Sequence, residues 1–528
     1  MFSKKFSLSH FSLFILLFFL FFSRFVKIDW GNDFFFHPDE NNMASAISQL
    51  SFTSLNPHFF SYGQFPLYLV FFTQTLFSQS GFSSAVFILR FYSALFSILS
   101  VFVFYKLSQI IFTQKKSSLI FVVLLIFSPG LIQTAHFGTT ESLLILIFAL
   151  NLYFSLLLLS TTHPLRLLFL LSLSSGIGLA SKLTALIFTL PVFLALFFRF
   201  FLSRKFLLFF SFSLFFFSTL LFFFLLFSPY NLIEFSDFIG AMRYEITVAD
   251  GSARVFYTSQ FLPTLPYLFQ LQKIFPHTSG LPVFILAIFS FPFLIKISTP
   301  KPKIIIFSLS VLVYFLYVGR LYVKWTRFMS PLFFIFPLLA TLTLSRLKSK
   351  KFFYLCFVIA IFPGLLFLSR YFYSDLRLQA SRWIDQNISP DSAIFSEAGN
   401  VVNLPLATQN FYQVDNFDFF TLDSKPQAVD DLVAGLYQSD FLLVPSRRIF
   451  KNQHGSAFPL SQSYYQALFS GNLGFTLVKQ FSSFPDFLLR AEQAEETWTV
   501  FDNPTIRIYK KTVPLTVSQY KKFFVYEK

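Results

Sequence analysis

The sequence contains a series of apolar runs, each about 17–25 residues long, that fill most of its first 369 positions. A helix of about 20 apolar residues spans the hydrocarbon core of a bilayer. Only 12% of the 528 residues are charged, against roughly 25% in soluble domains. We therefore expect a polytopic α-helical membrane protein with about 11 transmembrane helices. The predicted spans are 8–26, 82–105, 117–133, 139–160, 165–181, 183–200, 206–228, 279–296, 304–320, 328–345 and 352–369.

The net charge of +16 comes from the apolar half of the chain, where residues 1–369 hold 26 Lys and Arg against 9 Asp and Glu. This excess belongs to membrane loops, which argues against a nucleic-acid partner. Positive loops stay in the cytoplasm, so we predict a multi-pass protein of the plasma membrane with a cytoplasmic N-terminus. The same topology places all nine acids on the outer face, around long loops at 27–81 and 229–278. Acids contribute little to insertion, so a functional outer face explains them better.

The pattern changes after the last apolar run. An amphipathic helix follows Leu376, and short apolar runs read as strands around a further helix near 463–470. The predicted strands are 393–395, 441–445, 475–480, 498–501 and 505–509. We therefore divide the chain into a transmembrane domain, residues 1–369, and an extracytoplasmic α/β domain, residues 370–528.

Two adjacent carboxylates, Asp39 and Glu40, follow the first predicted helix within Phe36-His37-Pro38-Asp39-Glu40. A carboxylate at the lipid boundary is costly unless water, a cation or a substrate stabilises it. These residues are therefore the first candidates for catalysis. A helix that begins near Asp39 explains them almost as well, because Pro and acids favour the first helical turn.

Further polar residues reach the outer face at other turns of the predicted topology. His136 and Glu141 lie between the third and fourth spans, and Lys182 lies between the fifth and sixth. The remaining candidates are His37 in the first loop and the cations that precede the tenth span, Arg320, Lys324 and Arg327. Carboxylates beside cations suit a reaction in which a base deprotonates an acceptor while cations hold a leaving phosphate. Ordinary snorkelling at the interface is the alternative for each cation.

Other kinds of site find less support. Arg90 lies inside the second predicted span, so we expect it to pair with an acid. Histidines beside the carboxylates leave a divalent metal ion open as a cofactor, although their spacing fits no compact ligand motif. The single cysteine, Cys356, rules out a disulfide framework. A glycine-rich phosphate loop and a nucleophile elbow are both absent from the sequence, so ATP hydrolysis and serine-hydrolase chemistry have no support.

Five short motifs, in their order along the chain, carry a resemblance to a known family. They are His37-Pro38-Asp39-Glu40, the turn from His136 to Glu141, Gly178-Leu179-Ala180-Ser181-Lys182, Ser228-Pro229-Tyr230 and Arg327-Phe328-Met329-Ser330-Pro331. With them the chain resembles the bacterial GT-C glycosyltransferases of family 39, the group of protein mannosyltransferases and ArnT-like enzymes. Glu141 departs from this pattern, because relatives commonly carry an aspartate in that turn.

The resemblance implies a polyprenyl-phosphate-linked sugar as donor and a glycan, lipid or protein as acceptor. It implies that Asp39 is the general base and that Glu40 orients a substrate. Lys182 and Arg327 would neutralise the departing lipid phosphate in a single inverting displacement. Two other classes stay open: a transporter or lipid flippase with a solute-binding outer domain, and a noncatalytic envelope assembly factor. Transporters often contain internal repeats and broken helices at mid-membrane, and no repeat is apparent in this sequence.

Overall fold

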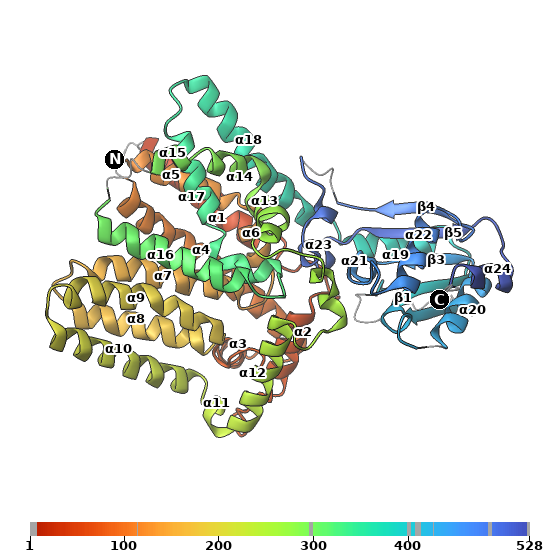
Figure 1. Ribbon diagram of the computed structural model, residues 1–528, viewed down its shortest axis with the longest axis horizontal. Helices are drawn as coiled ribbons and strands as arrows, with labels where there is room; N and C mark the ends of the chain where they lie inside the picture. The colour runs from red at the N-terminus through yellow and green to blue at the C-terminus, as the bar shows by residue number, and fades with distance from the viewer. Residues whose placement is uncertain are drawn as a thin grey trace, which may run out of the picture.

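The structure is a computed structural model that describes residues 8–112, 114–294, 299–398, 403–406, 413–425, 427–483 and 488–524. It contains a large helical body, followed along the chain by a small domain with a β-sheet (Figure 1). This is the fold class predicted from the sequence.

The helical body runs from α1 to α18, with short 3₁₀- and π-helical turns, labelled η, between several helices. Its α-helices are α1 (Leu8–Phe25), α2 (Pro38–Ser48), α3 (Phe65–Leu76), α4 (Phe82–Ile111), α5 (Lys115–Ile126), α6 (Pro129–His136), α7 (Glu141–Leu158), α8 (Pro164–Leu179), α9 (Leu190–Leu196), α10 (Phe206–Phe227), α11 (Tyr230–Ile233), α12 (Phe235–Asp250), α13 (Phe275–Ser279), α14 (Leu281–Ile288), α15 (Phe291–Leu294), α16 (Lys301–Gly319), α17 (Ile335–Leu344) and α18 (Lys350–Ser369). The other turns are η1 (Leu183–Thr189), η2 (Phe197–Phe201), η3 (Phe256–Phe261), η4 (Gln270–Ile274), η5 (Thr326–Leu332) and η6 (Arg370–Phe372).

Among the described residues, six helical stretches are long and apolar enough to cross a membrane, or up to eight if each of two bent pairs forms one span. The bent pairs are α5 with α6, at 52°, and η5 with α17, at 49°. Three shorter apolar helices lie beside them, at Leu13–Phe25, Phe65–Leu76 and Pro164–Leu179. Every predicted span coincides with one of these stretches except 279–296. There the chain forms the short helices α14 and α15, interrupted by a turn at Ser290.

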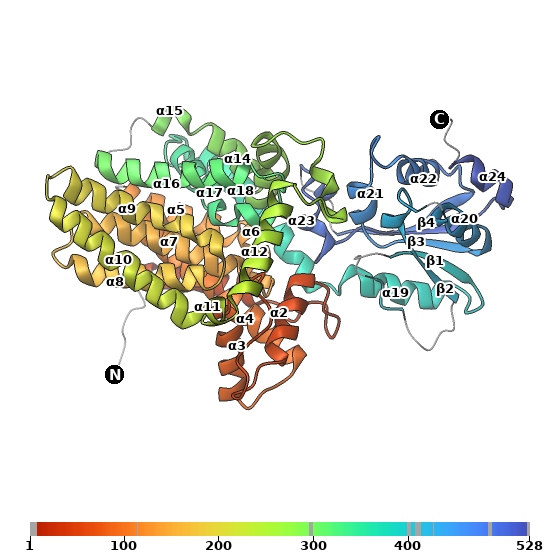
Figure 2. The same cartoon turned by 60° about the horizontal axis from the view of Figure 1, so that its bottom comes forward.

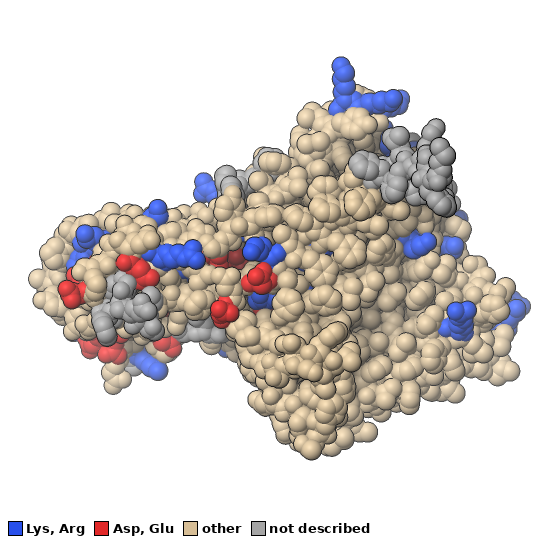
Figure 3. Space-filling view, turned by 180° about the vertical axis from the view of Figure 1, so that it is seen from behind, with Lys and Arg blue, Asp and Glu red and all other residues tan. Residues whose placement is uncertain are grey.

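The helices differ in how much of their surface other helices cover. In α7, 78% of an 18-residue apolar stretch is buried inside the protein, whereas in α10 the buried share of such a stretch is only 22%. The exposed side of α10 carries Phe210, Leu214 and Phe222. Figure 3 shows a broad face of the helical body with few charged side chains, which gather instead on the α/β domain. Such an apolar surface is typical of a protein embedded in lipid.

The small domain has a five-stranded sheet in the order β2-β1-β3-β5-β4. The strands are β1 (Ala393–Ala398), β2 (Gln413–Asp418), β3 (Phe441–Val444), β4 (Phe475–Phe481) and β5 (Ile506–Lys511). β1 pairs with β2 and β3 in parallel, and β5 pairs with β3 and β4 antiparallel. The helices are α19 (Leu376–Asn387), α20 (Ala428–Gln438), α21 (Arg448–Asn452), α22 (Pro459–Phe469), α23 (Thr497–Val500) and α24 (Val517–Lys522).

Alternating side chains of the strands fill two cores on opposite faces of this sheet. Phe441 and Leu443 of β3 pack with Ile384 of α19, whereas Leu442 and Val444 pack with residues of α20 and α22. One sequence prediction is wrong here, because residues 498–501 lie in and just after α23 and not in a strand. One strand, β2, was missed. β2 is a mostly exposed edge strand with the sequence Gln-Val-Asp-Asn-Phe-Asp, so it lacks the apolar run by which a buried strand is found.

The two parts of the chain meet through a small set of elements. Figures 1 and 2 show α2, α12 and α6 at the end of the helical body that faces the sheet domain, with α23 beside them. The residues with candidate chemistry come from this end.

Candidate active site

A cavity of about 640 Å³ opens between α2, α12, the end of α16 and η5. Its walls carry both acids and cations. The charged residues in its lining are Asp39, Lys182, Glu245, Asp250, Arg320 and Arg327. Aromatic side chains form much of the remaining wall, among them Tyr62, Tyr257 and Trp325. A concave space with apolar walls and a few convergent charges is the usual form of a ligand site.

Asp39 enters this cavity from the first turn of α2. The helix begins at Pro38, after His37 in an extended conformation, so the predicted helix start is confirmed. The Asp39 carboxylate forms an ion pair with Arg327 of η5, whose guanidinium also lies 3.5 Å from the Tyr62 hydroxyl. Burial opposes ionisation of Asp39, but Arg327, His37 and Lys182 outweigh it and lower the pKa of the carboxyl. Asp39 is therefore an ionised carboxylate at neutral pH.

Glu40 points in another direction and is fully buried outside the cavity lining. Its carboxylate accepts hydrogen bonds from Arg90 Nη2 at 2.7 Å and from the Gly138 backbone nitrogen at 2.6 Å. Arg90 also stacks on the Trp30 ring, with its guanidinium carbon 4.3 Å from the centroid. The predicted pairing of Arg90 with an acid is confirmed. A Cβ at Gly138 would lie 2.8 Å from the Leu89 Cβ, so the turn approaches α4 closely enough to require glycine.

Lys182 reaches the cavity just after α8. Its Nζ lies 3.5 Å from Glu141 Oε1 and 5.3 Å from the centroid of the Tyr62 ring. Backbone hydrogen bonds from Gly63 to Ser181 and from Phe65 to Ala180 hold the loop that carries Tyr62 against this turn. A Cβ at Gly63 would lie 2.0 Å from the Ala180 oxygen, so only glycine permits this approach.

The other predicted residues separate into those that face the cavity and those that do not. Arg320 lines the cavity and is exposed. Lys324 lies outside the lining, donates from Nζ to the Tyr322 oxygen at 2.8 Å, and has its pKa lowered to about 8 by burial. His37 packs between Phe137 and Phe501, and burial lowers its pKa.

His136 and Glu141 also lie outside the cavity lining. The two ring nitrogens of His136 face the Ile132 and Val26 oxygens at 2.8 and 2.9 Å, and the ring stacks on Tyr371. Glu141 is buried and touches the site through Lys182. The structure thus brings together Asp39, Lys182, Arg320 and Arg327.

Part of the cavity wall was not predicted from the sequence. Phe238, Met242, Glu245 and Ala249 of α12 all line the cavity, and their spacing puts them on one face of the helix. This period of three and four residues is visible in the sequence, so it could have singled out Glu245 among the outer-face acids. Tyr62 and Trp325 carry no comparable signal.

The metal ion that the sequence left open lacks a matching donor set in the part of the chain that the structure describes. There, His, Cys, Asp and Glu side chains form no group of three or more that could hold a metal ion. The charged groups in the cavity lining are instead three carboxylates and three cations.

A helical body with six to eight candidate membrane spans among its described residues, an acid–cation cavity within that body and a small sheet domain are the arrangement expected of the GT-C fold. Residues 66–231 match the sequence model of the dolichyl-phosphate-mannose-protein mannosyltransferase family. This match includes Lys182 and ends before Arg327. No curated protein matches the chain by sequence.

Two solved structures share the fold. ArnT from Cupriavidus metallidurans, bound to undecaprenyl phosphate, matches with a TM-score of 0.51 and 12% identity over 95% of this chain and 98% of that one. The archaeal oligosaccharyltransferase AglB from Archaeoglobus fulgidus, in complex with an inhibitory peptide and a dolichol-phosphate, matches with a TM-score of 0.51 and 13% identity over 86% and 72%. The chain thus has the GT-C glycosyltransferase fold, and the resemblance that its motifs indicate is confirmed. These matches give the transporter alternative no support.

Proposed function

We propose that this protein is a membrane glycosyltransferase that moves a sugar from a polyprenyl-phosphate donor to an acceptor hydroxyl. The observation that carries the proposal is the cavity in which ionised Asp39 lies beside Arg327 and near Lys182. One carboxylate and two cations are the groups that such a transfer needs. The lipid phosphates bound to ArnT and AglB support the same class of donor.

The donor phosphate binds Arg327 and Lys182. Both cations are paired with acids in the structure, Arg327 with Asp39 and Lys182 with Glu141. The donor phosphodiester carries one negative charge on two free oxygens that accept hydrogen bonds, and the lipid phosphate that leaves gains a second charge, so it competes for both cations. When Arg327 turns to the phosphate, the Asp39 carboxylate becomes free to accept a proton.

The reaction is one displacement. Asp39 accepts the proton of the acceptor hydroxyl while the acceptor oxygen forms a bond to the anomeric carbon. The bond between that carbon and the phosphate oxygen breaks, and its electron pair remains on the phosphate, where Lys182 and Arg327 stabilise the added charge. The anomeric centre inverts, and the products are the glycosylated acceptor and the lipid phosphate.

Glu40 acts in this proposal by holding α2 in place. Its carboxylate is occupied by Arg90 and Gly138, so it fixes the first turn of α2, and with it Asp39, against α4 and the turn before α7. Arg320 and Glu245 also line the cavity, and in this proposal they contact the sugar or the acceptor.

The proposal keeps the predicted topology, with the N-terminus in the cytoplasm and the α/β domain, residues 370–528, outside. Cysteines introduced at Ser252 and Ser349 in a Cys356→Ser background test it. A membrane-impermeant reagent applied to intact cells should label the cysteine at position 252 and leave position 349 unlabelled. Labelling of both from outside contradicts the topology.

The test of the function is turnover by purified protein supplied with polyprenyl-phosphate sugars and candidate acceptors. Wild type should release lipid phosphate, and Asp39→Asn should lower kcat by about 10²–10⁴-fold, the usual contribution of a general base. Asp33→Asn is the matched control, because Asp33 lies on the same loop, is exposed and is outside the cavity lining. Turnover in Asp39→Asn equal to that of wild type would remove Asp39 as the base.

A further inference from the structure

One short segment of the α/β domain, residues 495–501, contacts the chain beside both members of the Asp39–Arg327 ion pair. Glu495 is fully buried at its start. Its Oε2 accepts hydrogen bonds from the backbone nitrogen of Thr326 at 3.0 Å and from the Thr326 hydroxyl at 2.9 Å. Thr326 directly precedes Arg327 at the beginning of η5. Glu495 therefore holds the turn from which Arg327 enters the cavity.

The other end of the same segment supports Asp39. The ring of Phe501 lies 4.4 Å from the ring of His37, whose other side packs on Phe137 at 4.6 Å. His37 is the residue before α2 and stands two positions before Asp39. The rings thus fix the conformation of the chain at the point where it enters the helix that carries the proposed base.

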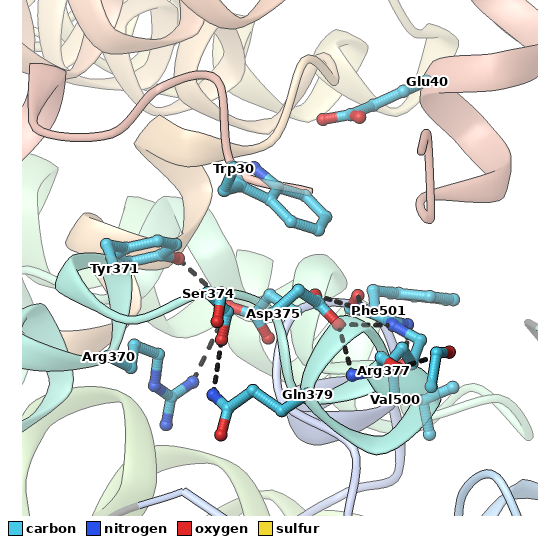
Figure 4. A network of polar contacts seen from close by, with 12 residues as sticks. Trp30, Glu40, Arg370, Tyr371, Ser374, Asp375, Arg377, Gln379, Val500 and Phe501 are labelled. Atoms are coloured by element: carbon cyan, nitrogen blue, oxygen red, sulfur yellow. Dashed lines mark hydrogen bonds and ion pairs between the residues drawn. The ribbon is translucent and has the colours of Figure 1, made fainter. Parts of the chain in front are cut away.

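The segment itself is tightly anchored to the helical body. Asp502 accepts hydrogen bonds from Tyr371 at 3.0 Å and Gln133 at 3.2 Å, and Gln133 also donates to the Trp498 oxygen at 3.0 Å. Figure 4 shows Arg377 of α19 directed toward Val500 and Phe501, whose carbonyl oxygens accept its hydrogen bonds.

Arg377 extends this anchor to the loop that leads to α2. It pairs with Asp375 at 2.8 Å, and its guanidinium carbon lies 3.7 Å from the centroid of the Phe36 ring. Because buried ion pairs and stacked rings resist displacement, the segment has little freedom to move relative to either element.

We propose that Glu495 and Phe501 are positioning residues that set the separation of Asp39 from Arg327. The two members of that pair lie 288 positions apart in the chain, so local structure does not fix their distance. Segment 495–501 contacts Thr326, the residue before Arg327, and His37, two residues before Asp39. The inference rests on the proposed function for its catalytic meaning, since a displacement of about 1 Å in an active site can lower turnover about 100-fold. The sheet domain is then part of the catalytic apparatus.

The variants that test this separate the hydrogen bonds of Glu495 from its charge. Glu495→Ala removes both, whereas Glu495→Gln removes the charge and keeps an oxygen that can accept from Thr326, with its amide nitrogen in place of the oxygen that accepts from Gln260 and Thr497. Phe501→Ala removes the ring from His37, and Phe501→Tyr keeps it. Glu492→Gln is the control, because Glu492 pairs with Arg507 of its own domain, at 2.6 Å, and is partly exposed.

We expect kcat to fall about 10–100-fold in Glu495→Ala and Phe501→Ala, with the donor KM changed less than threefold. Glu495→Gln and Phe501→Tyr should recover most of this loss, and Glu492→Gln should stay within twofold of wild type. Unfolding temperatures of the detergent-purified variants identify any that fail to fold. Folded alanine variants with wild-type kcat, or a loss confined to KM, overturn the proposal.

A second measurement does not depend on activity. Infrared titration follows protonation of the Asp39 carboxyl, with the band assigned by its loss in Asp39→Asn. If Glu495→Ala moves Arg327 away, the pKa of Asp39 rises, whereas loss of the Glu495 charge alone would lower it. An unchanged or lowered pKa in Glu495→Ala overturns the positioning role. If the pKa of Asp39 rises in Glu495→Ala but the wild type shows no turnover, the result contradicts the proposed glycosyl transfer and not the positioning role.

Discussion

Two acid–arginine pairs begin at neighbouring residues of α2 and have opposite surroundings. Asp39 pairs with Arg327 on the wall of the cavity, where the two side chains are 20% and 28% exposed. Glu40 pairs with Arg90 in a site where the exposures are 0% and 2%. Successive residues of a helix point about 100° apart, so adjacent acids reach different environments. A ligand in the cavity can reach the first pair and replace one of its members. The second pair is too buried for a ligand to reach.

The largest expected effect comes from breaking the sealed pair. Glu40→Gln leaves the Arg90 guanidinium buried without an opposite charge, which should cost about 3–5 kcal/mol of stability. Thermal unfolding in detergent, or retention after mild heating, measures this loss. Asp39→Asn should lower stability much less, because its partner can reach water. Equal unfolding temperatures for the two variants would contradict the division into an open and a sealed pair.

The sequence predicted much of the helical body because apolar length is a local property. The pairing of Arg90 with an acid was also predictable, since a charge inside a span needs a partner. The break between α14 and α15 was missed because the run is apolar almost throughout, although Pro292 in the first turn of α15 is a signal for a helix break. The edge strand β2 lacks the apolar pattern on which strand prediction depends.

Of the candidate site, the sequence identified the residue types but not their separation into two groups. Asp39, Lys182, Arg320 and Arg327 line the cavity, whereas Glu40 turns away from it. Which of two adjacent carboxylates faces a cavity depends on the rotation of α2 about its axis. Packing of α2 against α4 sets that rotation, and no local pattern encodes it. The support from Glu495 depends on a contact 169 positions away in the chain.

The open pair should respond more in activity than in stability. In the proposed mechanism Arg327 stabilises the leaving phosphate, so Arg327→Gln should lower kcat about 10²–10³-fold, as when one donor to a developing charge is lost. Steady-state kinetics with a polyprenyl-phosphate sugar measures the effect. Arg327→Lys keeps the charge but loses the planar two-point contact, so it should recover only part of the rate. Wild-type kcat in Arg327→Gln would remove Arg327 from the phosphate site.

The same pair predicts the acid limb of the pH profile. Asp39 must be ionised to act as a base, and Arg327, His37 and Lys182 lower its pKa, while Tyr62 donates a hydrogen bond to it. Activity should therefore persist until the pH falls through this lowered value. Any stability that Asp39 contributes is present above its ordinary pKa and is lost over the same fall. In Arg327→Gln, the acid limb of kcat/KM should move to higher pH. An acid limb that stays in place would show that another group titrates.

The smallest effect is expected at a cation that the sequence grouped with the others. Lys324 lies three residues before Arg327 but outside the cavity lining, and its ammonium group donates to the Tyr322 oxygen and lies near the Phe261 ring. Lys324→Gln should therefore change kcat less than twofold, whereas Lys182→Gln should lower kcat/KM for the donor at least tenfold. Burial lowers the pKa of Lys324 to about 8. If its charge mattered to donor binding, donor binding would therefore weaken as the pH rises from 7 to 9. A comparable loss of kcat/KM in both lysine variants would extend the phosphate site to Lys324. It would also contradict the distinction between residues that line the cavity and residues that are only close to them in the sequence.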